Sequence, residues 1–208
     1  MIKAVIFDID GVLLDSCEAN FKFYCNLMLK AGYRGPTRKE FPKIFHLSMV
    51  DTIRVVTGVN SEEEINRIWE LGKSGDVSYD YNLLTMPKRA EQVIETLSKD
   101  FLLGIVTSRV KENVYESPLL KKLEKFFKVV VAYQDTDNHK PQPDPLLLAA
   151  KRLSLEPGEC VYIGDVENDA IAAKAANMKI VIYSKDKFEK ADACTSSFEK
   201  IPELIAKL

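Results

Sequence analysis

Apolar residues in the second half of the chain occur in short runs that alternate with amphipathic stretches. A similar run opens the sequence at residues 3–7. It lacks the alternation of a half-exposed strand, and it is typical of a strand buried on both faces of a parallel sheet. The same kind of pattern predicts further strands over residues 101–106, 128–131, 160–163 and 179–182, and helices over residues 87–99, 145–153 and 169–176. This alternating order predicts an α/β fold with a doubly wound, Rossmann-like parallel sheet.

The stretch between the first strand and residue 86 carries helical signals only. A helix from Ser16 to Gly32 would be apolar on two faces, one of which includes Leu29, as expected for a helix packed among other helices. Capping boxes predict three further helix starts at residues 37–40, 48–51 and 61–64, and Pro42 limits the first of these to a short or kinked piece. We therefore expect an all-helical cap domain, residues 16–86, inserted into a core domain of residues 1–15 and 87–208.

Two local signals predict how helices begin and end in the second half. Asp144 suits an N-cap position, with Pro145 as the first helical residue. Asn177 suits the left-handed position that follows a helix, after the alanine-rich stretch.

The composition and the absent motifs exclude several functional classes, but they do not identify one. The 208 residues are 46% hydrophobic and 29% charged with a net charge of −2, so no nucleic-acid or membrane partner is indicated. The only histidines are His46 and His139, which excludes multi-histidine metal sites, and the GxxxxGK[ST], GxGxxG and GxSxG motifs are all absent. The four cysteines form no CxxC pair. We expect them to be reduced and the protein to be cytoplasmic, a monomer by default with a dimer as the alternative.

Polar and charged side chains follow the predicted strands at the points where the strands end. Because the carboxyl ends of parallel strands meet at one edge of a sheet, these residues should converge there. Four acids beside one ammonium and two hydroxyls would be a costly cluster without a ligand. The residues concerned are Asp8, Asp10, Thr107, Ser108, Lys140, Asp165 and Asp169.

These residues lie in four motifs whose order resembles that of the haloacid dehalogenase (HAD) superfamily, in its capped phosphatase branch, which is like phosphoglycolate phosphatase and β-phosphoglucomutase. The motifs are Asp8-Ile9-Asp10-Gly11-Val12, Thr107-Ser108, Lys140-Pro141 and Gly164-Asp165-Val166-Glu167-Asn168-Asp169. The position of the helical insertion and the motif spacing match as well, so the resemblance covers essentially the whole chain.

The resemblance implies a phosphatase that hydrolyses a small phosphorylated metabolite through an aspartyl-phosphate. Asp8 would be the nucleophile, since a carboxylate is already ionised at neutral pH and needs no base. Asp10 would protonate the leaving oxygen and then deprotonate the hydrolytic water. Thr107, Ser108 and Lys140 would bind the phosphoryl oxygens, and Lys140 would also balance the clustered acids.

The resemblance also implies a Mg²⁺ cofactor, because the available ligands are all oxygens. The ligands would be Asp8, the backbone carbonyl of Asp10, and Asp165. Asp169 would act either as a ligand through water or by orienting Lys140.

Other functions stay open at this point. A sugar-phosphate mutase is the main alternative, but mutases of this branch commonly carry a histidine where this chain has Asn20, and a Gly-x-Ser-Arg-like loop where residues 46–49 read His-Leu-Ser-Met. Haloacid dehalogenation is disfavoured by the acid at Asp10. A phosphoaccepting signalling receiver is disfavoured because its acceptor lies on a later strand, and a scaffold without activity is disfavoured by the intact motifs. Residues 16–86 hold equal numbers of basic and acidic residues, so they indicate no substrate.

Several conspicuous residues are expected to be ordinary. We expect Arg109 to be a surface arginine, and neither His46 nor His139 to take part in chemistry. Cys17 and Cys25 should be unreactive on or beside a buried helix face. The aromatic residues of the helical segment are expected to belong to its core rather than to a substrate cage; they are Phe21, Phe23, Tyr24 and Trp69.

Overall fold

A computed structural model describes all residues, 1–208. The chain divides into two compact units, one of Met1–Asp15 with Met86–Leu208 and one of Ser16–Thr85. Met86 therefore falls in the first unit, one residue before the predicted boundary. None of the helices combines the length and the apolar character that crossing a lipid bilayer requires.

The first unit is built on a six-stranded sheet in the order β3-β2-β1-β4-β5-β6, with every neighbouring pair parallel. The strands are β1 (Ala4–Phe7), β2 (Leu102–Val106), β3 (Phe127–Val131), β4 (Cys160–Gly164), β5 (Lys179–Tyr183) and β6 (Ala193–Thr195). The chain moves outward from β1 to β3 and returns across β1 to β4. This confirms the predicted doubly wound sheet and places a switch in strand order between β1 and β4.

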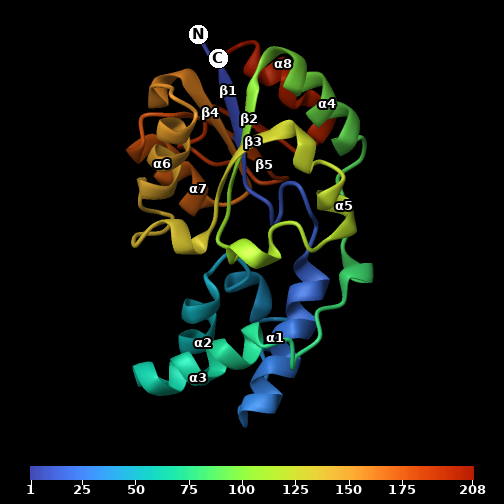
Figure 1. The fold of residues 1–208 in the computed structure, drawn as a ribbon, viewed down its shortest axis with the longest axis vertical. Coiled ribbons are helices and arrows are strands. Elements are labelled where there is room, and N and C mark those ends of the chain that lie inside the picture. The colour runs from blue at the N-terminus through green and yellow to red at the C-terminus, as the bar shows by residue number, and fades with distance from the viewer. The chain divides into compact units, whose positions relative to one another are not determined.

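Helices cover both faces of this sheet (Figure 1). One face is covered by α6 (Asp144–Arg152) and α7 (Glu167–Ala175), and the other by α4 (Ala90–Asp100) and α8 (Ile201–Ile205). Helix α5 (Pro118–Lys121) is a single turn, and short 3-10 turns occupy residues 111–113, 124–126, 133–135, 157–159 and 198–200. Two-sided coverage explains why β1 reads as an uninterrupted apolar run, since all four of its residues are fully buried.

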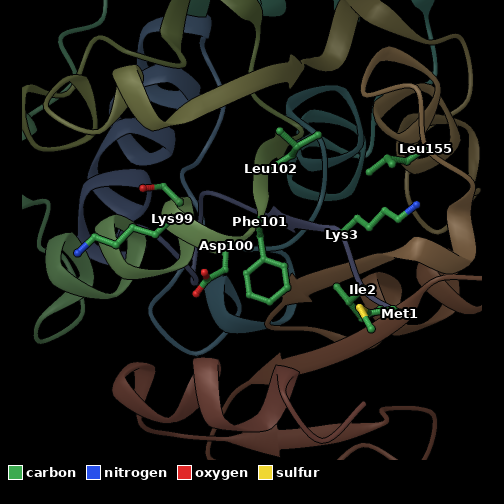
Figure 2. A pocket seen from close by; sticks show the side chains of 9 residues that line it. Met1, Ile2, Lys3, Lys99, Asp100, Phe101, Leu102 and Leu155 are labelled. Carbon is green, nitrogen blue, oxygen red and sulfur yellow. The ribbon is translucent and has the colours of Figure 1, made fainter.

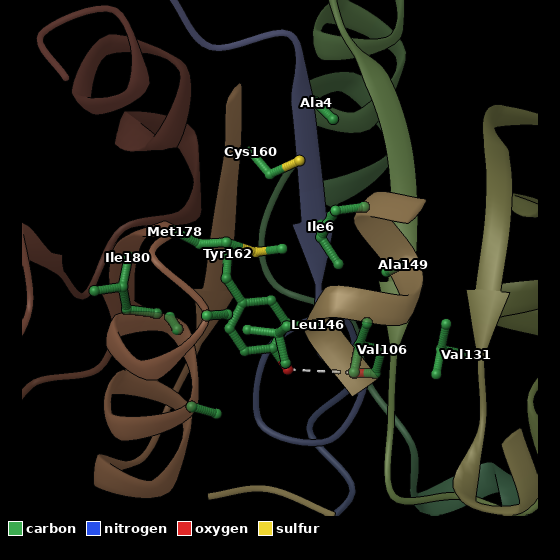
Figure 3. Close-up of a cluster of buried hydrophobic side chains, with 14 of the residues drawn as sticks. Ala4, Ile6, Val106, Val131, Leu146, Ala149, Cys160, Tyr162, Met178 and Ile180 are labelled. Atoms are coloured by element: carbon green, nitrogen blue, oxygen red, sulfur yellow. Dashed lines mark hydrogen bonds between the residues drawn. The ribbon is translucent and has the colours of Figure 1, made fainter. Parts of the chain in front are cut away.

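The core under α6 and α7 places one polar group deep inside the sheet layer. In Figure 3, Ile6 of β1 lies between Val106 of β2 and Tyr162 of β4, with Leu146 of α6 packed above them. The Tyr162 hydroxyl donates to the Val106 carbonyl across 3.3 Å, so this buried oxygen has a partner at the carboxyl end of β2.

Some helix ends differ from those predicted. Helix α6 begins at Asp144 itself and Pro143 takes the N-cap position, so the assignment of Asp144 as N-cap was wrong by one residue. The Asp144 carboxylate instead accepts a hydrogen bond from the Asn138 amide at 3.0 Å. Asn177 does adopt a left-handed conformation, with φ of 57°, as predicted.

The second unit contains α1 (Cys17–Ala31), α2 (Met49–Thr57) and α3 (Glu62–Lys73), with 3-10 turns at Phe41–Lys43 and Tyr81–Leu83. The Ser48 and Ser61 hydroxyls accept from the backbone N–H groups three residues later and cap α2 and α3 as predicted. The capping hydrogen bonds between Thr37 and Glu40 form too, but only the 3-10 turn with Pro42 follows them.

The core of the second unit lies between its three helices. Leu27 and Met28 of α1 pack with Ile53 of α2 and with Ile65 and Ile68 of α3, and partly buried aromatic side chains that include Phe23, Tyr24 and Trp69 pack around them. These aromatic residues therefore belong to the core, as expected. The prediction for Leu29 was wrong, because its side chain is 66% exposed.

Candidate active site

The carboxyl ends of β1, β2 and β4 bring most of the predicted residues to one edge of the sheet. Asp8 directly follows β1, Thr107 directly follows β2, and Asp165 directly follows β4. Asp169 stands in the first turn of α7, and Lys140 comes from the loop between β3 and α6. Parallel strands end at the same edge, so residues far apart in the sequence meet there.

Lys140 contacts three other residues at this edge of the sheet. Its ammonium donates to Asp8 Oδ2 at 2.7 Å, to Asp169 Oδ1 at 2.8 Å and to the Tyr162 hydroxyl at 2.9 Å. The Lys140 side chain is only 8% exposed, and its two carboxylate partners raise its pKa well above the ordinary value although burial opposes this. Lys140 therefore stays charged and uses all three of its N–H donors on fixed partners.

Asp169 is held so firmly that it serves as an anchor for Lys140. Its Oδ2 accepts from the backbone N–H groups of Asp165 at 3.0 Å and Val166 at 3.3 Å, while Oδ1 accepts from Lys140. The side chain is fully buried, and a Cβ on Gly164 would overlap it. The first-turn position on α7 adds a favourable helix dipole for the carboxylate.

Asp8, Asp165 and Asp169 form an oxygen-only cluster. One carboxylate oxygen from each lies within 4.8 Å of the others. Gly11 makes room for it, since its φ of 79° suits glycine and a Cβ there would overlap the Asp165 carboxylate. Crowded carboxylates repel one another unless a cation lies between them. The donor set therefore fits a hard divalent cation such as Mg²⁺, held chiefly by Asp8 and Asp165.

Burial shifts the protonation of these two acids strongly. Burial raises the pKa of Asp8 to about 7; Asp169 and Asp10 add to the rise, and Lys140 opposes it. Burial likewise raises the pKa of Asp165 to about 9, with further contributions from Asp169 and Asp8. A bound cation would favour the ionised form of both acids.

Asp10 is paired with Arg109, contrary to the expectation that this arginine is a surface residue. Arg109 Nε donates to Asp10 Oδ2 at 2.8 Å and Nη2 donates to Oδ1 at 2.7 Å, a bidentate fork. The side chains are 12% and 24% exposed, so the pair is largely withdrawn from water. Arg109 follows Thr107 and Ser108 at the end of β2. That strand-end position was the signal by which it could have been predicted.

Comparison with known proteins decides the family. A sequence model described as haloacid dehalogenase-like hydrolase matches residues 5–183 of the chain. The chain belongs to the haloacid dehalogenase-like hydrolase family. This confirms the resemblance stated from the four motifs, and the protein is hereafter called the hydrolase.

Its relatives include phosphatases and mutases. Pyrophosphatase PpaX of Bacillus pumilus is 30% identical over 185 residues, which cover 86% of this chain and 81% of the relative. The solved HAD-superfamily hydrolase of subfamily IA, variant 1, from Geobacter sulfurreducens has a TM-score of 0.71 at 25% identity, covering 98% of this chain and 96% of the other. The β-phosphoglucomutase of Clostridium difficile shares the fold, with a TM-score of 0.78 at 23% identity and coverage of 100% and 98%. The predicted enzyme class, a HAD-type phosphatase, is thereby confirmed.

The two predicted hydroxyl residues of the hydrolase differ in their surroundings. Thr107 is buried, and its Oγ1 accepts from the Arg109 N–H at 3.2 Å, which leaves the hydroxyl proton available for a ligand oxygen. Ser108 is exposed at the same edge. The Ile9 N–H, another expected phosphate donor, bonds to Asp8 Oδ1 at 2.8 Å in this structure.

Tyr162 is a site residue that the sequence analysis missed. Its hydroxyl accepts from Lys140, and burial raises its pKa well above the ordinary value, so it stays a neutral phenol. The sequence feature that could have predicted this role is the hydroxyl of Tyr162 within an otherwise apolar strand, two residues before Gly164. His139 lies beside Lys140 in the sequence, but its ring stacks on Tyr133 with centroids 3.9 Å apart.

A separate pocket lies at the opposite, amino ends of the strands (Figure 2). Lys3 and Leu102 border it at the starts of β1 and β2, and Met1, Phe101 and Leu155 contribute apolar side chains. Its lining contains none of the predicted catalytic residues.

The raised acid pKa values predict a pH-dependent stability for the metal-free hydrolase. Asp8 and Asp165 bind protons more tightly in the folded chain than in the unfolded one, so the stability that these two acids contribute is fully present below their ordinary pKa of 3.8 and is lost as the pH rises through 7 to 9. We expect the melting temperature in chelator to fall by several degrees over this range, on the order of 5 °C. Mg²⁺ should stabilise the protein more strongly as pH rises.

Melting curves in EDTA and in Mg²⁺ at each pH would check this prediction. Asp165→Asn should flatten the decline between pH 7 and 9, whereas Asp100→Asn, an exposed control at the end of α4, should leave it unchanged. A decline of the same slope in Asp165→Asn would contradict the assignment.

Proposed function

We propose that the hydrolase is a Mg²⁺-dependent phosphatase that cleaves small phosphorylated metabolites through an aspartyl-phosphate on Asp8. The observation that carries the proposal is the contact of Lys140 with both Asp8 and Asp169, beside the carboxylate of Asp165. The buried ammonium of Lys140 holds one carboxylate oxygen of Asp8 in place. Other carboxylate oxygens of the cluster can then bind a divalent cation beside an incoming phosphate.

Four side chains of the hydrolase take part in the proposed reaction. Asp8 attacks phosphorus as a carboxylate, forming one P–O bond while the bond to the leaving oxygen breaks. Asp10 donates a proton to that oxygen, and it later takes a proton from the water that attacks the acyl-phosphate. The Thr107 hydroxyl donates to a phosphoryl oxygen at the strand end beside Asp8. Lys140, whose three N–H donors are held by Asp8, Asp169 and Tyr162, stabilises the phosphoryl group by its positive charge.

Mg²⁺ would be held by the carboxylates of Asp8 and Asp165 and by the Asp10 carbonyl. When bound, it supplies charge neutralisation between Asp8 and the phosphate dianion. Asp169 is predicted to contribute mainly by orienting Lys140, because both of its oxygens already accept hydrogen bonds.

A sugar-phosphate mutase is the second candidate, and the fold shared with β-phosphoglucomutase is the observation that favours it. The local structure favours the phosphatase. Asn20 stands where mutases of this branch carry a histidine, and it is a structural residue of the second unit. Its Oδ1 accepts from the Tyr79 hydroxyl at 2.7 Å, and its amide donates to Ser16 Oγ at 3.4 Å.

We infer that the substrate is a small molecule rather than a nucleic acid or a membrane component, and that the protein acts as a monomer. All four cysteines are free thiols, which supports a reducing compartment such as the cytoplasm.

Removal of the metal should abolish turnover. We expect a panel of phosphate esters, including an aryl phosphate and inorganic pyrophosphate, to be hydrolysed with Mg²⁺ and to show rates at background level in EDTA. Readdition of Mg²⁺ should restore the rate, which excludes unfolding as the cause. Phosphate release that is equal with and without chelator would contradict the proposal, and conversion of glucose 1-phosphate to glucose 6-phosphate without phosphate release would favour the mutase.

A further inference from the structure

The phenol of Tyr162 shares the ammonium of Lys140 with two carboxylates. Lys140 Nζ donates to Asp8 Oδ2 at 2.7 Å, to Asp169 Oδ1 at 2.8 Å and to the Tyr162 hydroxyl at 2.9 Å. An ammonium has three N–H donors, so none is left for a phosphoryl oxygen while all three contacts are made. A phosphate that accepts a hydrogen bond from Lys140 has to replace one of these acceptors.

Tyr162 is the acceptor that a phosphate replaces at the lowest cost. Asp8 and Asp169 are carboxylates, and a buried carboxylate that loses its counter-charge is strongly destabilised. Burial raises the pKa of Tyr162 well above its ordinary value and keeps the side chain a neutral phenol. A negatively charged phosphoryl oxygen is a stronger acceptor for an ammonium than a neutral hydroxyl is. The N–H held by Tyr162 is therefore the one for which a phosphate competes.

The sheet fixes the Tyr162 hydroxyl in the position where it accepts this N–H. Tyr162 is fully buried on β4, and its hydroxyl donates to the Val106 carbonyl at the end of β2, across the intervening strand β1 (Figure 3). The hydroxyl proton is thereby directed to Val106, which leaves a lone pair of the oxygen for Lys140. The acceptor is thus part of the sheet core, and it does not depend on the conformation of a loop.

We propose that Tyr162 competes with phosphoryl oxygens for the third N–H of Lys140, and that this competition weakens the binding of phosphate, the product of the reaction. Tyr162 acts through Lys140 and is therefore a positioning residue. Its effect favours turnover, because an interaction that binds ground state and transition state equally lowers KM without raising kcat. This inference rests on the proposed phosphatase function. The competing interpretation is that the hydroxyl only stabilises the core, in which case its removal leaves phosphate affinity unchanged.

Tyr162→Phe tests the proposal by removing the oxygen and keeping the ring, whose centre lies 5.4 Å from the Lys140 ammonium. One N–H of Lys140 then lacks its phenol acceptor, and a phosphoryl oxygen can take it without displacing a protein group. We expect the variant to bind inorganic phosphate roughly 10-fold more tightly than the wild type in Mg²⁺, the scale of one hydrogen bond to a charged group. Titration calorimetry measures this affinity without turnover. With an aryl phosphate, KM and the inhibition constant of phosphate should fall together, and kcat should not rise.

Tyr183→Phe is the matched control. It makes the same change at the end of β5, where the ring packs edge-on against Phe198 and the contacts of Lys140 are left intact. Phosphate affinity should not change in this variant. Phosphate binding in Tyr162→Phe that is equal to or weaker than in the wild type would overturn the inference. A wild-type protein that hydrolyses no ester would refute the phosphatase, while the calorimetry would still decide the role of Tyr162.

A crystal structure of the wild-type protein with phosphate and Mg²⁺ gives a second measurement, which does not depend on the folding of a variant. Lys140 should keep both carboxylates and have one further acceptor, either the Tyr162 hydroxyl or a phosphoryl oxygen. A complex in which Lys140 donates to the phenol and to a phosphoryl oxygen together, after release of Asp8 or Asp169, would show that the phenol is not the competing group, and the inference would be wrong.

Discussion

Asp8→Asn is expected to reduce phosphate release by roughly 10⁴-fold or more, the scale seen when the nucleophile of a catalytic unit is removed. The amide has nearly the same shape as the carboxylate, but it cannot form the acyl-phosphate. Wild-type protein quenched in acid during turnover should carry a phosphoryl group on residue 8, and the variant should carry none. Phosphate release and intact-protein mass together check this result.

The variant should remain folded, which makes its loss of activity interpretable. Its amide oxygen can still accept from Lys140, and the change removes a carboxylate whose pKa burial raises to about 7. Above that pH, in chelator, we expect a melting temperature equal to or above that of the wild type. Asp100→Asn, an exposed change at the other edge of the sheet, is the activity control. A rate within tenfold of the wild type in Asp8→Asn would refute the nucleophile assignment.

The strands that place the site were predictable because burial on both faces leaves a continuous apolar run. β1, β4 and β5 are such runs, and each strand that ends in a polar residue places that residue at the same edge. β6 and α8 were not predicted. β6 has three partly exposed residues, Ala193–Thr195, and is ordered by pairing with β5 rather than by its own pattern. α8 is a five-residue helix with a proline in its first turn, too short for periodicity to show.

The residue types of the site were predictable, but their pairing was not. Arg109 and Asp10 are 99 residues apart, and Lys140 and Asp8 are 132 apart, so no local pattern links them. Which cation meets which acid depends on side-chain reach across neighbouring strand ends, which is a tertiary property. Tyr162 was missed for the related reason that a buried tyrosine in a strand is usually a packing residue, and only the position of Lys140 gives its hydroxyl a role at the site.

Lys140→Met should be the most destabilising single change at the site, and it should also abolish turnover. The ammonium is the buried counter-charge of Asp8 and Asp169, and removal of one partner from such a pair costs about 3–5 kcal/mol because the remaining charges are left uncompensated. Loss of the lysine also removes the interaction that lowers the pKa of Asp8, so that pKa rises further above about 7. Protonation can then relieve part of the cost.

The sign of the pH dependence follows from this shift. Lys140 itself stays charged from pH 5 to 9, since its pKa is raised well above the ordinary value, whereas wild-type Asp8 in chelator is ionised only above a pKa of about 7. In Lys140→Met the Asp8 carboxyl becomes neutral as pH falls, so the difference in melting temperature from the wild type should be largest near pH 8–9 and should shrink toward pH 5. Thermal unfolding in chelator at several pH values measures this difference directly.

A second substitution on the same contact tests whether charge, rather than packing, is the cause. In Lys140→Met with Asp169→Asn, one uncompensated carboxylate is gone. The double variant should therefore lose less stability than the sum of the two single changes, with a coupling of about 1–3 kcal/mol. Lys99→Met, an exposed change on α4, provides the control for introducing methionine. Strict additivity, together with a stability difference that does not depend on pH, would show that Lys140 acts by filling space, and the proposal that it balances the charge of the acids would then be wrong.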